Sequence, residues 1–380
     1  MLEGGRISEA ELIAMMMYTV MGTAFFFLPA VAAAFAGRDV WLTPILAVVA
    51  GFLVALFTGY LSSRFSGFNF FNWTEIILGK TGGKILQFFY VLWFLHVTSI
   101  IVNEFVYFVR IAFMPVTPPL VFSILLLILT GVAVYGGVEM IGRLAIVYLP
   151  VSIVISMGIT LMAAGLYDFA NLTPILERGI APVLAGTFPP AGWRSEIFLG
   201  AMFFPFLKRP EKAGWVLFRA DLWIGFLLLV DALSVTLAFG DEAARLTLPV
   251  YSLAREINLM HFFQHMEALV LIMWFAGIFV KVAAWEYATM LGMAQWLNLK
   301  SYRPLVLPGS LLLAAVTNYD MPNVAILTHF LASVTPFDLM LFTIVLPGIL
   351  VVLSLVRKSL NPRRVKRKGF PGKNVVADPG

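Results

Sequence analysis

Cysteine is absent from this 380-residue sequence, and histidine occurs only four times. The lack of cysteine excludes disulfides, thiolate metal ligands and thiol nucleophiles, and the histidines form no paired zinc-binding spacing. Charged residues make up 12% of the chain, against roughly 25% in soluble domains. The sequence therefore indicates neither metal chemistry nor a nucleophile–base pair, and we expect a protein that is not an enzyme and has no cofactor.

Hydrophobic residues, in contrast, make up 61% of the chain, and the mean hydropathy is +0.92. A soluble core cannot hide this much apolar surface from water. Apolar runs of helical length recur along the chain, which predicts an all-α integral membrane protein with ten transmembrane helices. The expected spans are 10–36, 41–63, 83–113, 119–136, 143–166, 194–209, 212–239, 266–297, 302–318 and 336–357.

The N-terminus carries three acidic residues and one arginine before the first apolar run, which is not typical of a secretory signal peptide. Ser8 and Glu11 have the spacing of a capping box, so the first helix is predicted to begin near Glu9. A second start, Asn72-x-x-Glu75, predicts a short interfacial helix within residues 66–82.

The distribution of basic residues predicts the orientation of the chain. With the N-terminus in the cytoplasm, nineteen of the 26 lysines and arginines lie inside, six lie outside, and Lys281 lies within a span. The positive-inside rule therefore favours cytoplasmic ends and an even number of spans. Residues 168–193 and 240–265 then lie outside, either as a lid or as ordinary surface packing.

Residues 1–360 are predicted to form one transmembrane domain, and residues 361–380 a basic, disordered cytoplasmic tail. We interpret the tail as an orientation signal that is attracted to anionic membrane lipids. This interpretation is favoured over docking of another protein or of nucleic acid, and no nucleic-acid partner is expected.

Two spans contain similar helix-breaking segments. The first holds Gly22-Thr-Ala-Phe-Phe-Phe-Leu-Pro29, and the sixth holds Gly200-Ala-Met-Phe-Phe-Pro205. Each opens a run of five spans, about residues 8–166 and 194–357, and an odd number of spans inverts the second run. This pattern predicts a five-plus-five inverted repeat with discontinuous first and sixth helices. Glycine and proline are also common in membrane helices, which is the alternative reading of each segment alone.

The chain resembles the amino acid–polyamine–organocation superfamily of transporters, and more closely the B subunit of the GerA-type spore germinant receptors. The resemblance covers about residues 5–358 and is carried by four stretches: Asn171–Gly186, Glu196 with Phe203–Phe206, Pro249–Ile257 and Trp274–Lys281. It implies a LeuT-like fold in the inner membrane of the bacterial spore. It also implies a small-molecule germinant, often an amino acid, and two partners, a membrane A subunit and a lipoprotein C subunit.

Backbone groups freed at the two breaks are expected to bind both charges of an amino acid. The predicted site takes Met21, Gly22, Thr23 and Ala24 from the first helix and Leu199, Gly200 and Phe203 from the sixth. The third helix lines the substrate cavity in the resembling fold, which implies roles for His96 and Ser99.

Lys281 is the most conspicuous ionisable residue within a span. An unpaired ammonium there would be costly, so Lys281 needs a partner. In sodium-coupled members of the resembling fold the eighth helix helps to bind a cation, which implies that Lys281 stands in for that cation. The alternative is a structural ion pair with Glu286. Glu196 is interpreted as a charge at a helix N-terminus beside Arg194.

Two functions remain open at this point. The resemblance favours a membrane subunit of a germinant receptor that binds its ligand in a transporter-like pocket and triggers germination. The alternative is a proton-coupled amino acid permease. The identity of the germinant does not follow from the residues, because recognition by backbone groups leaves little side-chain code.

Overall fold

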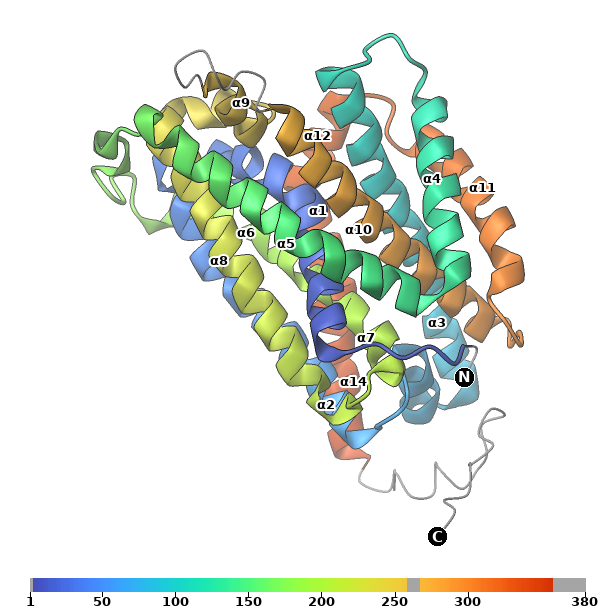
Figure 1. The fold of residues 1–380 in the computed structure, drawn as a ribbon. Helices are drawn as coiled ribbons and strands as arrows, with labels where there is room; N and C mark the ends of the chain where they lie inside the picture. Colours follow the sequence, from blue (N-terminus) through green and yellow to red (C-terminus); the bar gives the residue numbers. More distant parts are fainter. Residues whose placement is uncertain (1–2, 258–266, 358–380) are drawn as a thin grey trace.

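The computed structural model describes residues 3–257 and 267–357, which form a bundle of helices (Figure 1). Seven stretches of this described chain are long and apolar enough to cross a membrane: Glu9–Arg64, Phe70–Ala112, Pro119–Gly136, Val138–Leu166, Pro210–Arg245, Ala268–Trp296 and Thr335–Val356. The first stretch contains two helices, α1 (Glu9–Ala36) and α2 (Thr43–Arg64), which are joined by the 3₁₀ turn Gly37–Leu42. The multi-pass helical architecture expected from hydropathy is confirmed.

The predicted start of α1 is confirmed. The Ser8 hydroxyl accepts a hydrogen bond from the backbone N–H of Glu11 at 3.2 Å, and the Ser8 N–H donates to the Glu11 carboxylate at 2.6 Å. These two bonds satisfy backbone donors that have no partner within the helix. The short helix expected at residues 66–82 also exists, as the first turns of α3 (Phe70–Ala112), and Gly79 with φ 83° separates it from the rest. Its cap is Asn69, not Asn72.

Most of the remaining helices follow the expected spans. They are α4 (Pro119–Gly136), α5 (Val138–Met162), α8 (Ala213–Phe239), α10 (Glu267–Trp296) and α11 (Arg303–Asp320). The last span comprises α13 (Thr335–Met340), a π turn (Leu341–Val345) and α14 (Leu346–Val356). Two short helices, α9 (Pro249–Glu256) and α12 (Val324–Ser333), lie between spans. Helix α5 begins five residues early because Gly137, at φ 93°, turns the chain directly out of α4.

The sixth helix is interrupted, as expected, but by 3₁₀ turns and not by an unwound segment, and its predicted start is wrong. Helix α6 (Ile180–Ser195) begins fourteen residues before the predicted start, and Pro189 and Pro190 lie inside it. The 3₁₀ turn Glu196–Leu199, the single turn α7 (Gly200–Phe203) and the 3₁₀ turn Phe204–Phe206 follow. The two prolines were read as part of an outer loop, whereas prolines are tolerated in helices that pack among other membrane helices.

The expected interruption of the first helix is wrong. Helix α1 runs without a break from Glu9 to Ala36, with Gly22 and Pro29 inside it. Glycine costs a helix only about 1 kcal/mol relative to alanine, and tertiary packing readily compensates for that amount. In this chain Gly22 serves a close helix crossing, as described below, and not an unwound segment.

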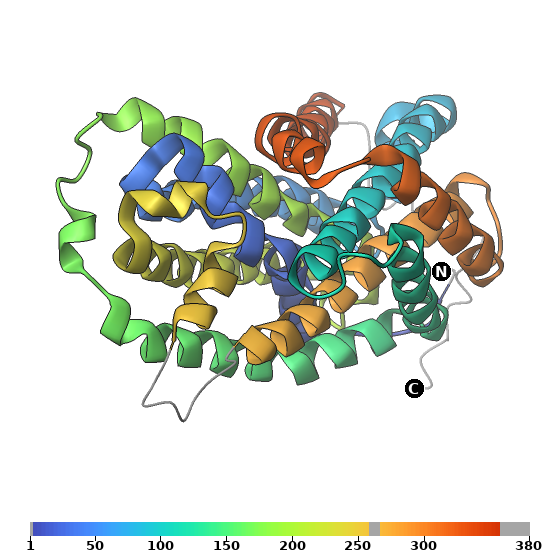
Figure 2. The same cartoon turned by 90° about the horizontal axis from the view of Figure 1, so that it is seen from above.

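Helix α1 lies in the interior of the bundle and contacts α5, α6, α8 and α10 (Figure 2). The N-terminal segment and the end of α14 lie on one side, and α9 lies on the opposite side (Figure 1). On that opposite side Arg38 forms a 2.6 Å ion pair with Asp241 and donates to the carbonyl of Thr173 at 2.8 Å. Both segments expected to form a lid thus contact Arg38, and they also meet each other, since a Cβ on Gly240 would lie 2.7 Å from the Asn171 side chain. Residues 258–265 of the expected outer loop, and the basic tail, lie outside the described residues.

Candidate functional site

Lys281 lies at the centre of the bundle, and its side chain is fully buried. Its ammonium forms a 2.8 Å ion pair with Glu196 and donates a hydrogen bond to the Thr23 hydroxyl at 2.9 Å. These contacts join α10 to α1 and to the 3₁₀ turn that follows α6. The alternative expectation, a pair between Lys281 and Glu286, is wrong, because the Glu286 carboxyl group is hydrogen-bonded to hydroxyl groups on α4 and α11.

Glu196 owes its position to the interruption after α6. It is the first residue of the 3₁₀ turn, with α6 ahead of it, and it is buried. The expectation that Glu196 caps a helix N-terminus beside Arg194 is therefore wrong. Arg194 instead forms its own buried ion pair with Asp221 of α8 at 2.5 Å. Residues Ile180–Phe206, from α6 through α7 and the turns beside it, are called the sixth element below. Two of its neighbouring charges thus make separate ion pairs inside the bundle.

A third charged group adds to the central cluster. Glu104 of α3 is buried and interacts electrostatically with both Lys281 and Glu196. Within the described part of the chain, Glu104 Oε1 has no hydrogen-bond partner. Two buried carboxyl groups thus lie near one ammonium. Because an uncompensated charge is costly in an apolar interior, a proton or a cation is needed to balance the second carboxyl group.

Glycines bring α1 and α10 close together beside this cluster. A Cβ atom on Gly22 would lie 3.0 Å from the carbonyl oxygen of Gly277 and 3.1 Å from the Cβ of Lys281. Such distances leave no room for a larger side chain unless the helices separate. The Trp193 indole N–H also donates to the Thr23 hydroxyl, at 3.2 Å. The position of Lys281 relative to α1 therefore depends on glycine at position 22.

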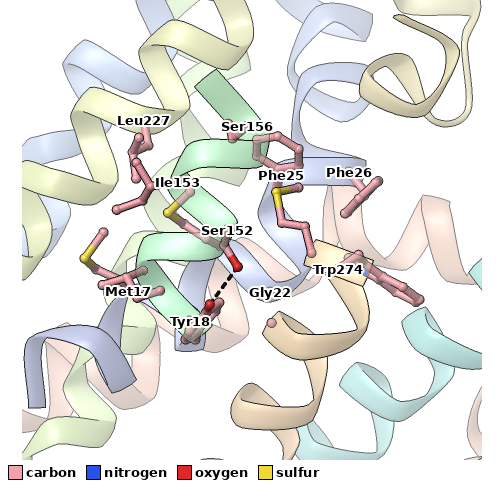
Figure 3. A pocket seen from close by; sticks show the side chains of 14 residues that line it. Met17, Tyr18, Gly22, Phe25, Phe26, Ser152, Ile153, Ser156, Leu227 and Trp274 are labelled. Carbon is pink, nitrogen blue, oxygen red and sulfur yellow. Dashed lines mark hydrogen bonds between the residues drawn. The ribbon is translucent and has the colours of Figure 1, made fainter. Parts of the chain in front are cut away.

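A cavity of about 30 Å³ lies next to the crossing of α1 and α10 (Figure 3). Met21 and Gly22 of α1 line it together with residues of α5, α8 and α10, and most of the lining is apolar. The polar exceptions are Tyr18, Ser152 and Ser156, and the Tyr18 hydroxyl is hydrogen-bonded to that of Ser152 at 2.7 Å. A cavity with aromatic walls and a few hydroxyl groups suits a small, partly apolar ligand.

The structure brings only part of the predicted site together. Met21 and Gly22 line the cavity, and Thr23 contacts Lys281. Ala24 is buried on the same helix. Backbone groups of α1 are not freed here, because the helix is continuous.

The residues of the sixth element face elsewhere. A Cβ on Gly200 would meet Leu217 and Met16, and Phe203 stacks on Tyr287 with ring centroids 5.6 Å apart. Leu199 is fully buried in the hydrophobic core. None of these three residues lines the cavity of Figure 3.

His96 and Ser99 form a separate cluster with α11. The His96 ring nitrogen Nδ1 lies 3.4 Å from the Asp320 carboxylate, and the Ser99 hydroxyl donates to the same carboxylate at 2.6 Å. Their helical spacing correctly indicates a common face of α3. That face contacts α11, and neither side chain lines the cavity.

Sequence reasoning missed Glu196, Glu104, Trp193 and the Tyr18–Ser152 pair as parts of the site. Glu104 offered a signal, since it is a lone acid in an apolar run, as Lys281 is a lone base. The two residues are 177 positions apart in the chain. Nothing in the local pattern indicates that they lie near each other.

Solved structures with a similar arrangement of helices define the class of this protein. MhsT in complex with L-phenylalanine matches with a TM-score of 0.66 at 12% identity, over 93% of this chain and 90% of MhsT. Mhp1, a nucleobase-cation-symport-1 family transporter in a closed conformation with bromovinylhydantoin bound, matches with a TM-score of 0.62 at 14% identity, over 93% and 80%. The protein therefore has the membrane transporter fold known as LeuT-like.

Within that class, the chain belongs to the spore germination protein family, whose model matches residues 6–325. It is similar to spore germination protein KB of Bacillus subtilis, with 25% identity over 98% of this chain and 100% of that protein. Spore germination protein YndE of the same organism is 26% identical over 68% of this chain and 70% of its own length. The family resemblance expected from the sequence is confirmed.

Proposed function

We propose that this protein is the membrane subunit of a nutrient germinant receptor and binds a small germinant, an amino acid, in the cavity between α1, α5, α8 and α10. The observation that carries the proposal is the buried Lys281–Glu196 pair, which joins α10 to the interrupted sixth element beside that cavity. Membership of the spore germination family supports the germination role. The phenylalanine bound to MhsT and the hydantoin bound to Mhp1 support a small-molecule ligand.

The size of the cavity indicates how binding is coupled to signalling. Its volume of about 30 Å³ is well below the roughly 300–1,000 Å³ of typical ligand pockets. A germinant therefore enters only when α1 moves relative to α5, α8 or α10. Such a movement acts directly on Thr23 and Lys281, since the hydrogen bond between them spans α1 and α10. The conformational equilibrium of the receptor shifts to the extent that the ligand binds the state with the enlarged cavity more tightly than the other state.

The assembly and topology that accompany this role are proposals as well. Ten transmembrane helices place both chain ends in the cytoplasm, in the inner membrane of the bacterial spore. A membrane A subunit and a lipoprotein C subunit complete the receptor. Arg38 and Asp241 then close the outer side of the bundle, where a germinant arrives.

A thermal-shift screen of the purified protein against amino acids tests ligand binding. A ligand at 100 times its Kd raises the free energy of unfolding by about 2.7 kcal/mol. An amino acid that stabilises the wild type should not stabilise Gly22→Val, in which α1 and α10 are forced apart. Gly158→Val is the matched control, because a Cβ at Gly158 meets no atom within 4 Å. If an amino acid stabilises the wild type, Gly22→Val and Gly158→Val equally, the ligand binds at another site.

A proton-coupled amino acid permease is the second candidate, and one observation favours it. The cluster of Glu104, Glu196 and Lys281 needs one further positive charge, which a transported proton can supply. Proteoliposomes that contain the purified chain alone distinguish the two functions. Amino acid uptake driven by a pH gradient, and abolished by Glu104→Gln, would establish the permease, whereas ligand stabilisation without uptake favours the receptor.

A further inference from the structure

A second buried carboxyl group lies outside the site described above. Glu286 of α10 is fully buried and reaches two hydroxyl groups on two other helices. Its Oε1 lies 2.5 Å from the Ser310 hydroxyl of α11, and its Oε2 lies 2.7 Å from the Thr130 hydroxyl of α4. Gly131, next to Thr130, leaves space for the Ser310 hydroxyl, since a Cβ there would lie only 3.3 Å from the hydroxyl oxygen. Three helices thus meet at one carboxyl group.

The number of protons available at this junction indicates whether Glu286 is ionised. Each hydroxyl also lies close to a carbonyl oxygen of its own helix, Ser310 to Val306 at 2.8 Å and Thr130 to Leu126 at 3.0 Å. Four short oxygen–oxygen contacts therefore share two hydroxyl protons. An ionised carboxylate adds no proton, so two of the four contacts have no hydrogen between their oxygens. A carboxylic acid adds one proton, so only one of the four contacts lacks a hydrogen.

No basic side chain in the described part of the chain forms an ion pair with Glu286. The charged and titratable groups of the three helices that meet here make other contacts or lie nearer the helix ends. Lys281 contacts Glu196 and Thr23, Tyr287 contacts Glu3, and Arg303 donates to the carbonyl of Tyr135. The others are Tyr135 itself, which is exposed, Glu267 at the first position of α10, and Tyr319 and Asp320 at the far end of α11. An ionised carboxylate without a counter-charge is costly in this environment.

We propose that Glu286 is a proton-binding site, occupied in this conformation, whose carboxylic acid holds α4 and α11 against α10. The acid donates its proton to one hydroxyl, and that hydroxyl donates its own proton to the carbonyl of its helix. Separation of α4 or α11 from α10 removes these partners and admits water, so the proton is released as the junction opens. The ligand of this site is H⁺, and the site is independent of the germinant cavity.

Infrared difference spectroscopy of the full-length protein at neutral pH tests the proposal. Subtracting the spectrum of Glu286→Gln from that of the wild type should show the loss of one carboxylic-acid C=O band and no loss of carboxylate bands. Glu242→Gln is the control, because Glu242 is exposed and pairs with Arg245, so this variant should lose carboxylate bands. Loss of carboxylate bands in Glu286→Gln would overturn the proposal.

A second variant covers the case in which Glu286→Gln fails to fold. Ser310→Ala removes one hydrogen-bond partner and keeps Glu286. A carboxylic-acid C=O band should then shift in frequency, because the hydrogen bonding of the acid has changed. If Ser310→Ala shifts only carboxylate bands, Glu286 is ionised and the proposal fails. Neither measurement depends on germinant binding, so the result is separate from the test of the receptor function.

Discussion

Replacing Lys281 by methionine should destabilise the protein strongly, because it leaves Glu196 buried without its counter-ion. Removing one partner of a buried ion pair typically costs about 3–5 kcal/mol. Methionine has nearly the length of the lysine stem, so the change removes the charge with little loss of packing. Replacing both partners, as in Lys281→Met with Glu196→Gln, removes the unpaired charge and should restore much of the lost stability.

The double-mutant cycle isolates the energy of this pair. We expect a coupling energy of about 2–3 kcal/mol, near the upper end of the range for residues in direct contact. The measurement is unfolding of each purified variant in detergent, followed by tryptophan fluorescence, since the chain contains nine tryptophans. Arg245→Met provides the control, because it breaks the exposed pair with Glu242 and should cost at most about 1 kcal/mol.

Additive effects in this cycle would refute the assignment. If the double variant loses the full sum of the two single losses, Lys281 and Glu196 do not stabilise each other. The functional result should agree with the energetic one. Lys281→Met should insert in the membrane yet abolish the germination response, and the wild-type response should persist when sodium is replaced by potassium. A strict requirement for sodium would show that Lys281 does not stand in for a coupling cation.

Three further predictions concern the helix crossing, the first helix start and the topology. Gly22→Val should weaken the germinant response at least tenfold in a dose–response assay, because its side chain would clash with Gly277, whereas Gly158→Val should leave the response unchanged; equal responses would contradict the close crossing. Ser8→Ala should lower the free energy of unfolding by about 1 kcal/mol through loss of the helix cap, measured by denaturant unfolding, and no loss would mean that the cap is not formed. Asp241→Cys and Asn361→Cys, each the only cysteine in its chain, should react with a membrane-impermeant maleimide from opposite sides; labelling from one side would contradict the ten-span topology.

Hydropathy predicted most helices because burial in lipid requires long apolar segments, whatever their neighbours are. It failed at α6, where Pro189 and Pro190 and a short apolar run indicated a loop. Helix α6 exists because it packs against α1 and α2, and these contacts are long-range. The break predicted at Gly22 failed for a related reason. A glycine permits either an unwound backbone or a close crossing, and only the neighbouring helix decides between them.

The candidate site was predictable one residue at a time but not as a set. Lys281 was recognisable because a lone ammonium in an apolar span needs a partner. The identity of that partner depends on how α10 and the sixth element lie in space. Glu286 is the acid nearest to Lys281 in the sequence of α10, yet it faces α4 and α11. Helical periodicity assigns residues to faces and does not say which neighbour each face meets.

The observed geometry replaces one mode of recognition with another. Two broken helices would have offered freed backbone groups to both charges of an amino acid. In this conformation only the sixth element is interrupted, and its interruption places a side chain, Glu196, beside Lys281. The continuous helix α1 contributes the Thr23 hydroxyl, and its Gly22 allows α10 to pack closely against it. Charge at the centre of the bundle is therefore held by side chains of α1, α10 and the sixth element, and any movement of α1 that admits a ligand must first rearrange those contacts.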